Sequence, residues 1–343
     1  MSTGTLPVAS QVRQRLLDAH ERFRTVTDGR VSRVYPALAE ADPDRFGLAV
    51  ASVTGTVHAV GDTGVRFAIM SAVKPFVHAL ACEHHTAPTV RRRIGANATG
   101  EPFNGAGAVE RAPDGRTNPM VNAGAIATVA LLPGAGLEDR WGRLRAALSR
   151  FAAEALDLDE EVYRSAAASN QRNRSLAWLL DSLGALDADP METVELYTRA
   201  CCLAVTVRDL AVMGAVLADG GVQPVTAERV VGPAACRETL AAMITAGMYE
   251  ASGEWLCEVG LPAKSGIAGG IVTVSPGKGA LATFSPRLDE AGNSVRGTLA
   301  ARSVSRTLGL DLLASMSART DAVEPSRTAT GSPPHLPAER RSP

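Results

Sequence analysis

Lysine is almost absent from this chain. Only three of its 35 basic side chains are lysines, Lys74, Lys264 and Lys278, and the remaining 32 are arginines. Arginine stays protonated in proteins, whereas a buried lysine can lose its proton and act as a base. Each lysine is therefore a candidate for a role that arginine could not fill.

The chain also lacks an excess of charge of either sign. Its 343 residues carry 35 basic and 36 acidic side chains, which gives a net charge of −1. The only dense basic cluster is the arginine triplet 91–93, which we expect to be solvated. Because there is no basic stripe to attract phosphates, neither nucleic acid nor an acidic membrane surface is expected as a partner.

Long apolar runs are missing as well. The most apolar stretch, 123–132, stops at Pro133 and is far shorter than the ~20 residues that a membrane span needs. The first thirty residues are polar and charged, without the apolar segment of a secretory signal. We therefore expect a cytoplasmic protein of ordinary globular composition.

Cysteine and histidine do not form metal-binding patterns. The chain has five cysteines: Cys82, Cys201, Cys202, Cys236 and Cys257. They show no CxxC spacing, and His84 and His85 are adjacent rather than a helical turn apart, so we expect reduced core thiols and no metal site. A P-loop and a GxGxxG motif between strand and helix are also absent, so no nucleotide or other cofactor is indicated.

Hydrophobic periodicity predicts an α+β fold. Helical patterns cover 11–26, 144–156, 175–183, 206–217, 237–245 and 299–313, and strand patterns cover 48–53, 57–60, 271–274 and 280–284. Strands near both ends of the chain, with helices between them, imply one antiparallel sheet built from N- and C-terminal segments. A helical region of about 76–256 is then inserted between the two parts of the sheet.

The expected organisation has three parts, which are an N-terminal helix within 1–28, one main domain at 29–316 and a tail at 317–343. The stretch 319–343 holds five prolines and only two large aliphatic side chains, Val323 and Leu336. Such a segment cannot bury enough apolar surface to offset the entropy of ordering it. A disordered tail is therefore predicted.

The segment Ser71-Ala72-Val73-Lys74 is an SxxK element. Two side chains three positions apart lie on one face of a helix. Serine is a weak nucleophile that needs a base within hydrogen-bond reach, and a desolvated lysine can be that base. Pro75 fits only the first turn of a helix, which places Ser71 and Lys74 at the beginning of one. Taken alone, this common element carries little weight.

A second lysine lies in Lys264-Ser265-Gly266, directly before a predicted strand. This segment resembles the KTG element of serine β-lactamases and penicillin-binding proteins. The glycines at 266, 269 and 270 allow a ligand to approach the backbone, and an N–H near Ile267 can serve as an oxyanion donor. The alternative is a glycine-rich turn with Lys264 exposed at its mouth. Both elements together favour a serine acyl-enzyme.

Longer segments around these motifs resemble the serine-dependent glutaminase family. They occur in order over about 29–300 and comprise 61–63, 71–75, 118–126, 172–173, 197–201, 220–221, 247–249, 260–266, 284–286 and 292–297. The stretches NPMVNAGAI at 118–126 and LPAKSG at 261–266 are long and nearly unbroken. The resemblance implies that the main domain has a β-lactamase-like fold and is catalytic. It also implies hydrolysis of L-glutamine to L-glutamate and ammonia without a cofactor.

The resemblance also implies roles for individual residues. Ser71 would be the nucleophile that attacks the carboxamide carbon, Lys74 its general base and Tyr249 a second proton relay. Further positions match substrate contacts or support the site, namely Asn122, Asn173, Tyr197, the backbone of Ile267, Lys264 and Ser265. The same resemblance implies a homo-oligomer, either a dimer or a tetramer.

Four positions depart from the family's pattern. Ala166 stands where a glutamate would pair with the substrate ammonium, and Met70 replaces a glutamine before the serine. Val34 takes the place of a tyrosine, with Tyr35 displaced by one, and 97–100 reads NATG instead of EPSG. All four are expected to touch the pocket. Losing one partner of a buried charged hydrogen bond costs on the order of 2 to 5 kcal/mol, so recognition of free L-glutamine is in question.

Two alternatives to a glutaminase remain open from the residues alone. The first is a divergent serine hydrolase that acts on an ester or a lactam, which the NPMVNAGAI stretch disfavours. The second is a weakly active paralogue that binds an amino acid or a partner protein as a regulator, which Ala166 and Met70 suggest. The less favoured alternatives are a turn or cap residue for Asn122 and core rings for Tyr197 and Tyr249.

Overall fold

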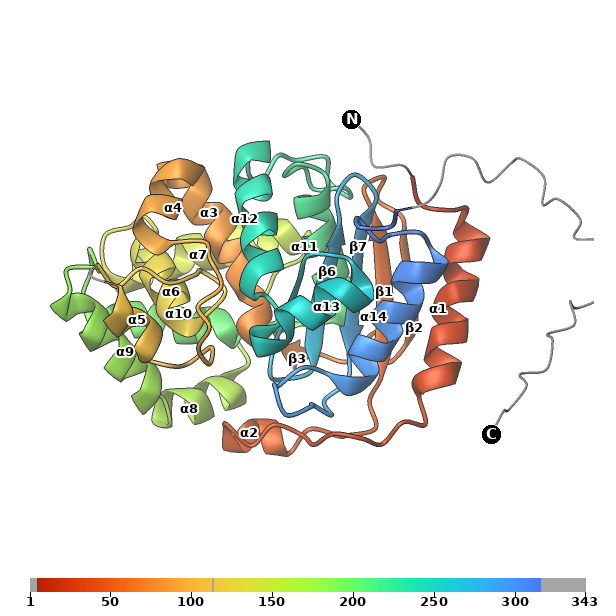
Figure 1. The fold of residues 1–343 in the computed structure, drawn as a ribbon, viewed down its shortest axis with the longest axis horizontal. Helices are drawn as coiled ribbons and strands as arrows, with labels where there is room; N and C mark the ends of the chain where they lie inside the picture. Colours follow the sequence, from red (N-terminus) through yellow and green to blue (C-terminus); the bar gives the residue numbers. More distant parts are fainter. Residues whose placement is uncertain (1–4, 113, 316–343) are drawn as a thin grey trace, which may run out of the picture. The chain divides into compact units, whose positions relative to one another are not determined.

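The computed structural model describes residues 5–112 and 114–315 (Figure 1). Spatial contacts between residues divide the chain into two units, 1–313 and 314–343. The helices and strands belong to the first unit. The predicted tail at 317–343 lies outside the described residues.

The strands of the described residues form two sheets. Their bounds are β1 (Gly47–Ser52), β2 (Val57–Gly61), β3 (Phe67–Ala68), β4 (Ala204–Val205), β5 (Ala263–Ser265), β6 (Gly270–Ser275) and β7 (Gly279–Phe284). The helices are α1 (Ala9–Phe23), α2 (Pro36–Ala39), η1 (Met70–Val73), α3 (Lys74–His85), α4 (Ala87–Ile94), α5 (Gly107–Arg111), α6 (Asn122–Ala130), α7 (Leu137–Ala152), α8 (Glu160–Ala168), α9 (Gln171–Ser182), α10 (Pro190–Cys201), α11 (Val207–Ala218), α12 (Pro233–Ala246), η2 (Tyr249–Ala251), α13 (Ser252–Val259) and α14 (Val295–Thr307).

The main sheet joins the two ends of the domain. Its five strands are antiparallel in the order β2-β1-β7-β6-β5. The N-terminal hairpin pairs with the C-terminal one through β1 and β7, with Gly47 opposite Phe284 and Ser52 opposite Gly279. This arrangement confirms the predicted sheet and the inserted helical region. A small sheet of β3 and β4 was not predicted.

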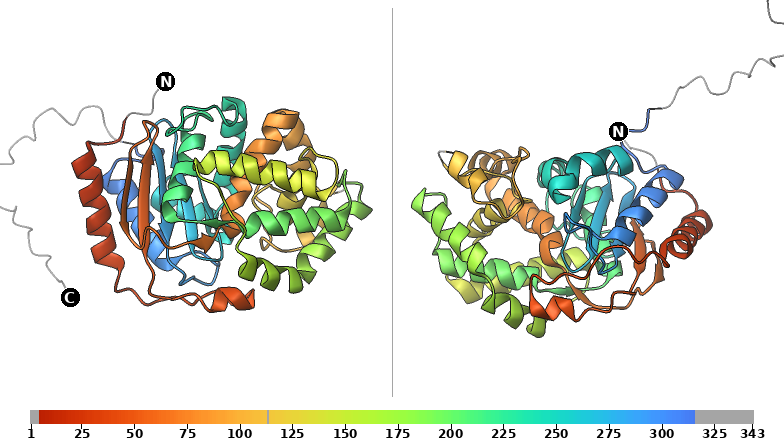
Figure 2. Two further views of the ribbon diagram at one scale, coloured as in Figure 1. Left: turned by 180° about the vertical axis from the view of Figure 1, so that it is seen from behind. Right: turned by 60° about the horizontal axis from the view of Figure 1, so that its bottom comes forward.

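Each face of the main sheet is covered by helices. On β1, Leu48 and Val50 face the cluster that contains α1 and α14, whereas the alternate residues Ala49 and Ala51 face the cluster of the helical region. Figure 2 shows α1 and α14 side by side on one face and α11 on the other. Gly214 lets α11 approach closely, because a Cβ there would lie 2.7 Å from side-chain atoms of Ala280 and Val272.

The closing helix is shorter than predicted. The apolar pattern of 299–313 indicated a helix to Leu313, but α14 ends at Thr307 and a turn with Gly309 at φ +61° follows. Leu308 and Leu310 nevertheless remain buried in the core beside α1. Their apolar character therefore marks buried chain after the helix rather than the helix itself.

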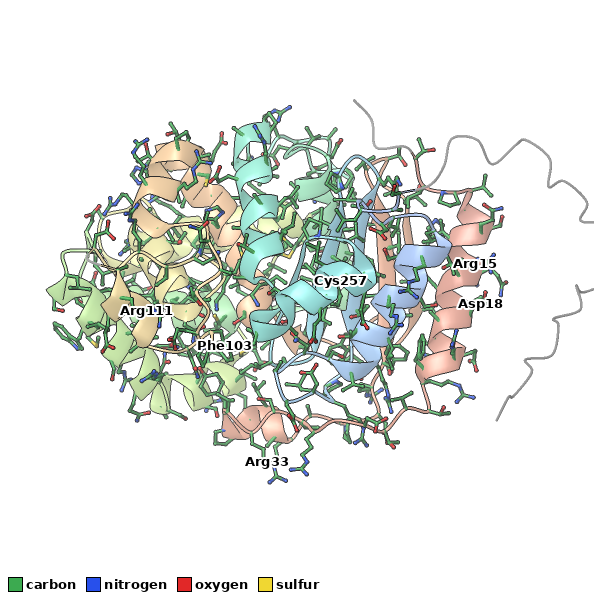
Figure 3. All side chains as sticks on the ribbon, viewed as in Figure 1. Arg15, Asp18, Arg33, Phe103, Arg111 and Cys257 are labelled. Atoms are coloured by element: carbon green, nitrogen blue, oxygen red, sulfur yellow. The ribbon has the colours of Figure 1, made fainter. Side chains whose placement is uncertain are left out.

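The thiols follow the prediction with one exception. The four cysteines 82, 201, 202 and 236 are buried and unbridged, but Cys257 is exposed on α13 (Figure 3). The prediction was wrong for Cys257 because it lies on the outer side of a short amphipathic helix, whose buried side carries Trp255 and Val259. No helix of the described ranges is long and apolar enough to cross a membrane.

We predict that α1 stabilises the domain through Leu16. Leu16 is fully buried, whereas its neighbour Leu17 is 37% exposed. Leu16→Ala should lower the free energy of unfolding by about 2 to 5 kcal/mol, because it leaves a cavity between α1 and the sheet. Leu17→Ala, the matched control, should change it by about 0.5 kcal/mol or less. Urea unfolding followed by circular dichroism tests both, and equal effects would contradict the packing described here.

Candidate active site

The SxxK element forms a tight turn followed by a helix. Ser71 lies in the 3-10 turn η1, and α3 begins at Lys74 with Pro75 in its first turn, as the sequence predicted. The backbone N–H of Ile69 donates to Leu203 O at 2.9 Å and holds the turn against β4. Met70 has φ +48°, a left-handed conformation that is strained for a residue with a side chain.

Lys74 is buried and its hydrogen-bond partners are uncharged. Its Nζ donates to Asn122 Oδ1 at 2.7 Å and to Met120 O at 3.2 Å. Burial disfavours the ammonium form and lowers the pKa of Lys74 to about 7, an effect that Cys201 opposes. A substantial share of the amine is therefore unprotonated at neutral pH.

A second buried lysine lies beside Tyr249. Lys264 Nζ donates to Gly247 O and to Ser265 O, both at 2.8 Å, and lies 4.0 Å from the centroid of the Tyr249 ring. Burial, together with the charge of Lys74, lowers the pKa of Lys264 well below its usual value. The alternative of an exposed Lys264 is wrong, since the side chain is fully buried.

The Tyr249 hydroxyl lies close to residues of both motifs. It donates to Ser265 O at 3.2 Å. Burial raises the pKa of Tyr249 to about 12, and hydrogen bonding with Ser71 acts in the opposite direction. Tyr249 has φ +55°, so this residue, like Met70, is held in a strained conformation. Tyr249 thus contacts both Ser71 of the first motif and Ser265 of the second.

Gly266 brings β5 against the turn that carries Ser71. A Cβ at position 266 would lie 2.7 Å from Ile69 O and 3.3 Å from Ala72 N. Only glycine permits this approach without displacing the backbone around the serine. Ile267 follows directly and reaches the same cavity.

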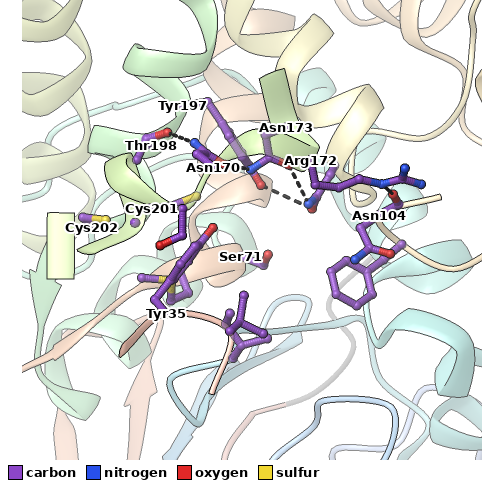
Figure 4. Close-up of a pocket in the computed structure, with 17 residues that line it drawn as sticks. Tyr35, Ser71, Asn104, Asn170, Arg172, Asn173, Tyr197, Thr198, Cys201 and Cys202 are labelled. Atoms are coloured by element: carbon purple, nitrogen blue, oxygen red, sulfur yellow. Dashed lines mark hydrogen bonds between the residues drawn. The ribbon is translucent and has the colours of Figure 1, made fainter. Parts of the chain in front are cut away.

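A cavity of about 120 Å³ opens beside Ser71 (Figure 4). It is lined by Val34, Tyr35, Met70, Ser71, Phe103, Asn104, Asn122, Ala166, Ser169, Asn170, Arg172, Asn173, Tyr197, Thr198, Cys201, Cys202 and Ile267. The structure therefore brings together every predicted substrate contact except Tyr249. The remaining predicted site residues, Lys74, Tyr249, Lys264 and Ser265, lie outside this lining set.

Three of the four departures from the family's pattern lie at this cavity. Ala166, Met70 and Val34 line it, and so does the displaced Tyr35. The segment 97–100 does not line this cavity but two neighbouring ones. The prediction that it touches the pocket beside Ser71 is therefore wrong.

The cavity contains one fixed positive charge and no fixed negative charge. Among the described residues that line it, Arg172 is the only Lys or Arg and none is Asp or Glu. Arg172 Nε donates to Asn104 O at 2.7 Å. In the part of the chain that the structure describes, no cluster of His, Cys, Asp and Glu could hold a metal ion.

Asn170 and Thr198 were not predicted as site residues. Both are buried, and Asn173 Nδ2 donates to Asn170 Oδ1 while Asn170 Nδ2 donates to Thr198 Oγ1, each at 2.6 Å. The signal in the sequence was the spacing of Asn170 and Asn173, which lie three positions apart at the start of a helix. The contact with Thr198 could not be predicted, since it depends on how α9 packs on α10.

The fold and the matched relatives define a protein of the β-lactamase-like class. The solved structure of the probable glutaminase ybaS has a TM-score of 0.88 and 40% identity, covering 90% of this chain and 99% of that one. The structure of Mglu in its glutamate form has a TM-score of 0.84 and 43% identity, covering 89% of this chain and 70% of that one.

Sequence comparison identifies the family itself. The model of the glutaminase family matches residues 29–313. Glutaminase 2 of Yersinia pestis is 54% identical over 315 residues, which cover 92% of this chain and 93% of the relative. The glutaminase of Mycobacterium ulcerans is 44% identical over 303 residues, which cover 88% and 95%. The chain belongs to the glutaminase family.

We predict that Lys74 loses its proton near neutral pH. With ¹³Cε-labelled lysine, the NMR signal that disappears in Lys74→Arg should titrate with a midpoint at pH about 7, the pKa to which burial lowers this amine. The chain has only three lysine signals to assign. The signal that disappears in Lys278→Arg belongs to Lys278, so the remaining one belongs to Lys264. A Lys74 signal that keeps the shift of a charged amine up to about pH 9 would contradict the prediction.

Proposed function

We propose that the chain hydrolyses L-glutamine to L-glutamate and ammonia through an acyl-enzyme on Ser71. The observation that carries this proposal is the buried amine of Lys74, whose pKa is lowered to about 7, one helical turn from a serine that lines a small cavity. Family membership supports the carboxamide as the substrate. The relative Mglu has been solved in a glutamate form, which is consistent with glutamate as the product proposed for this chain.

In the first half of the reaction, the neutral amine of Lys74 takes the proton of Ser71 while Oγ attacks the carboxamide carbon. The carbonyl oxygen becomes an oxyanion that the backbone N–H groups of Ser71 and Ile267 stabilise. When the C–N bond breaks, the proton passes from Lys74 through Tyr249 to the leaving nitrogen. Ammonia departs and the acyl group remains as an ester on Ser71.

In the second half, Lys74 deprotonates a water molecule that attacks the ester carbon. The tetrahedral intermediate collapses, Ser71 Oγ recovers a proton from Lys74, and glutamate leaves. Atoms and protons balance without a cofactor. Tyr249 is suited to relay a proton rather than to act as the base, because burial raises its pKa to about 12.

The cavity can hold the amino-acid end of glutamine mainly through neutral groups. Arg172 and the hydroxyl of Tyr197 are donors for the α-carboxylate, and amide oxygens such as that of Asn173 are acceptors for the ammonium. Ala166 leaves the ammonium without a carboxylate partner. We further propose, from the family resemblance, that the protein is a cytoplasmic homo-oligomer, a dimer or tetramer, which light scattering after size exclusion would test.

The central test is glutamate release from L-glutamine. Ser71→Ala and Lys74→Arg should each reduce kcat by at least about 10³-fold, because the first removes the nucleophile and the second keeps a charge but removes the base. Lys278→Arg is the matched control. Lys278 lies in the turn between β6 and β7, so this variant should leave kcat unchanged. Full activity of either site variant would contradict the proposal, and so would an inactive wild type over a panel of carboxamides.

Restoring a carboxylate should improve binding of the substrate ammonium. Ala166→Glu should lower the KM for L-glutamine by at least about tenfold, since a charged hydrogen bond to the ammonium is gained. The gain should vanish for glutaramate, which lacks the α-amino group. Ala168→Glu, on the exposed side of α8, is the matched control. An unchanged KM in Ala166→Glu would remove this account of the departure.

A further inference from the structure

We propose that Asn170 and Thr198 are positioning residues that keep the carbonyl side of the Asn122 amide turned toward Lys74. The inference rests on the proposed function, in which Lys74 is the general base. Neither residue needs to touch the substrate for this role, since both act through the amides between them and the lysine.

A continuous series of hydrogen bonds leads away from the lysine. Lys74 Nζ donates to Asn122 Oδ1 at 2.7 Å, and Asn122 Nδ2 donates to Asn173 Oδ1 at 3.0 Å. Asn173 Nδ2 then donates to Asn170 Oδ1 at 2.6 Å. Some of the dashed lines in Figure 4 mark the bonds of this series that join residues drawn there, and others mark bonds outside it, such as that of Arg172 with Asn104.

The series ends on the backbone of α10. Asn170 Nδ2 donates to Thr198 Oγ1 at 2.6 Å, and the Thr198 hydroxyl donates to Val194 O at 2.7 Å. A carbonyl oxygen can only accept, so every proton in the series points away from Lys74. Asn170 and Thr198 line the cavity but are each only 4% exposed, and in the structure they are hydrogen-bonded to each other.

The direction of the series decides what the lysine can do. A neutral amine has two N–H donors and one lone pair. Asn122 Oδ1 and Met120 O, at 2.7 and 3.2 Å, accept the two N–H groups, so the lone pair remains free for the Ser71 proton. If the Asn122 amide were turned over, its Nδ2 would donate to the lone pair, and Lys74 could no longer act as a base.

Thr198 supplies the acceptor that favours one direction over the other. If a methyl group replaced its hydroxyl, the amide of Asn170 would have no acceptor for its Nδ2 and no reason to keep that side toward α10. Turning Asn170 would then allow Asn173 and Asn122 to turn as well, because each amide follows its neighbour. The Thr198 hydroxyl on α10 thereby determines whether the lone pair of the Lys74 amine on α3 is free to accept a proton.

The titratable groups around Lys74 come from several elements. Tyr197 and Cys201 lie on α10, Tyr249 lies on η2, and Lys264 lies on β5. Of these groups, Tyr197 contacts the series directly, because its hydroxyl donates to Asn122 Oδ1 at 3.4 Å. A change at Asn170 or Thr198 is expected to alter Lys74 through the amides.

The test compares Thr198→Val with Thr198→Ser by measuring glutamine hydrolysis against pH. Valine keeps the shape of threonine but removes the acceptor, so kcat should fall at least about tenfold, whereas serine keeps the hydroxyl and should remain within about threefold. The base works when unprotonated, so kcat/KM rises as pH passes upward through the Lys74 pKa. Losing the ordered acceptors destabilises the ammonium, and this rise should move to lower pH by about half a unit.

Asn170→Asp should shift the same rise in the opposite direction. A carboxylate at this position still accepts from Asn173, but its negative charge favours the ammonium form of Lys74. The rise should therefore move to higher pH by about one unit. Gln171→Glu, the matched control, adds the same charge at an exposed neighbouring position and should leave the profile unchanged. General loosening of the site would not produce opposite shifts.

The outcomes separate this inference from the proposed function. If Lys74→Arg retains activity, Lys74 is not the base and both proposals fall. If Lys74→Arg is inactive but Thr198→Val and Asn170→Asp leave both kcat and the pH profile unchanged, the positioning inference alone is wrong. Thermal unfolding checks that each variant is folded, and Thr198→Ala, which removes the same oxygen, replaces the valine variant if that one does not fold.

Discussion

The desolvation of one amine is the constraint on which the site depends. Transferring an ammonium group from water into a protein interior is costly, so a buried lysine either pairs with a carboxylate or shifts its pKa. Here the partners of Lys74 are an amide and a backbone carbonyl, and its pKa falls to about 7. Lys264 is also buried and held by carbonyl oxygens, and burial together with the charge of Lys74 lowers its pKa well below the usual value. The scarcity of lysine in the sequence is consistent with this arrangement, because an arginine would keep its charge in either place.

The fold supplies the rigidity that such a site requires. The main sheet ties the N-terminal hairpin to the C-terminal one, and β5 at its edge meets the Ser71 turn through the small volume of Gly266. Met70 and Tyr249 both keep φ values near +50°, at +48° and +55°. Conformations of this kind persist only where the surrounding packing over-determines them. The packing around the two buried turns, η1 and η2, therefore stabilises the strained residues and fixes the positions of Ser71 and Tyr249.

Sequence reasoning succeeded where one residue imposes a local constraint. The strand patterns at 48–53 and 280–284 predicted β1 and β7 of the sheet, and Pro75 located the start of the helix after the serine. It failed where burial or pairing depends on distant segments. The two-residue strands β3 and β4 are too short to have a pattern of their own and exist only because they pair with each other. Leu308 and Leu310 were assigned to a helix because buried residues after a helix can continue its apolar spacing. The exposure of Cys257 depends on which side of α13 faces the core. The contact between Asn170 and Thr198 likewise exists only because α9 and α10 pack together.

The lack of a carboxylate in the cavity has two opposed consequences. A glutamate at position 166 would offer a partner to a ligand ammonium, but its negative charge would also raise the pKa of Lys74 and leave less of that amine unprotonated at neutral pH. Arg172 is the only fixed charge among the described lining residues. The net charge of a bound ligand therefore has a large influence on the pKa of Lys74. A zwitterionic amino acid adds no net charge and leaves the protonation of the amine as it is, whereas a carboxamide with a carboxylate alone would favour the ammonium form. The electrostatics of this cavity therefore suit a zwitterionic ligand, although none of the described lining residues is an Asp or Glu that could pair with its ammonium.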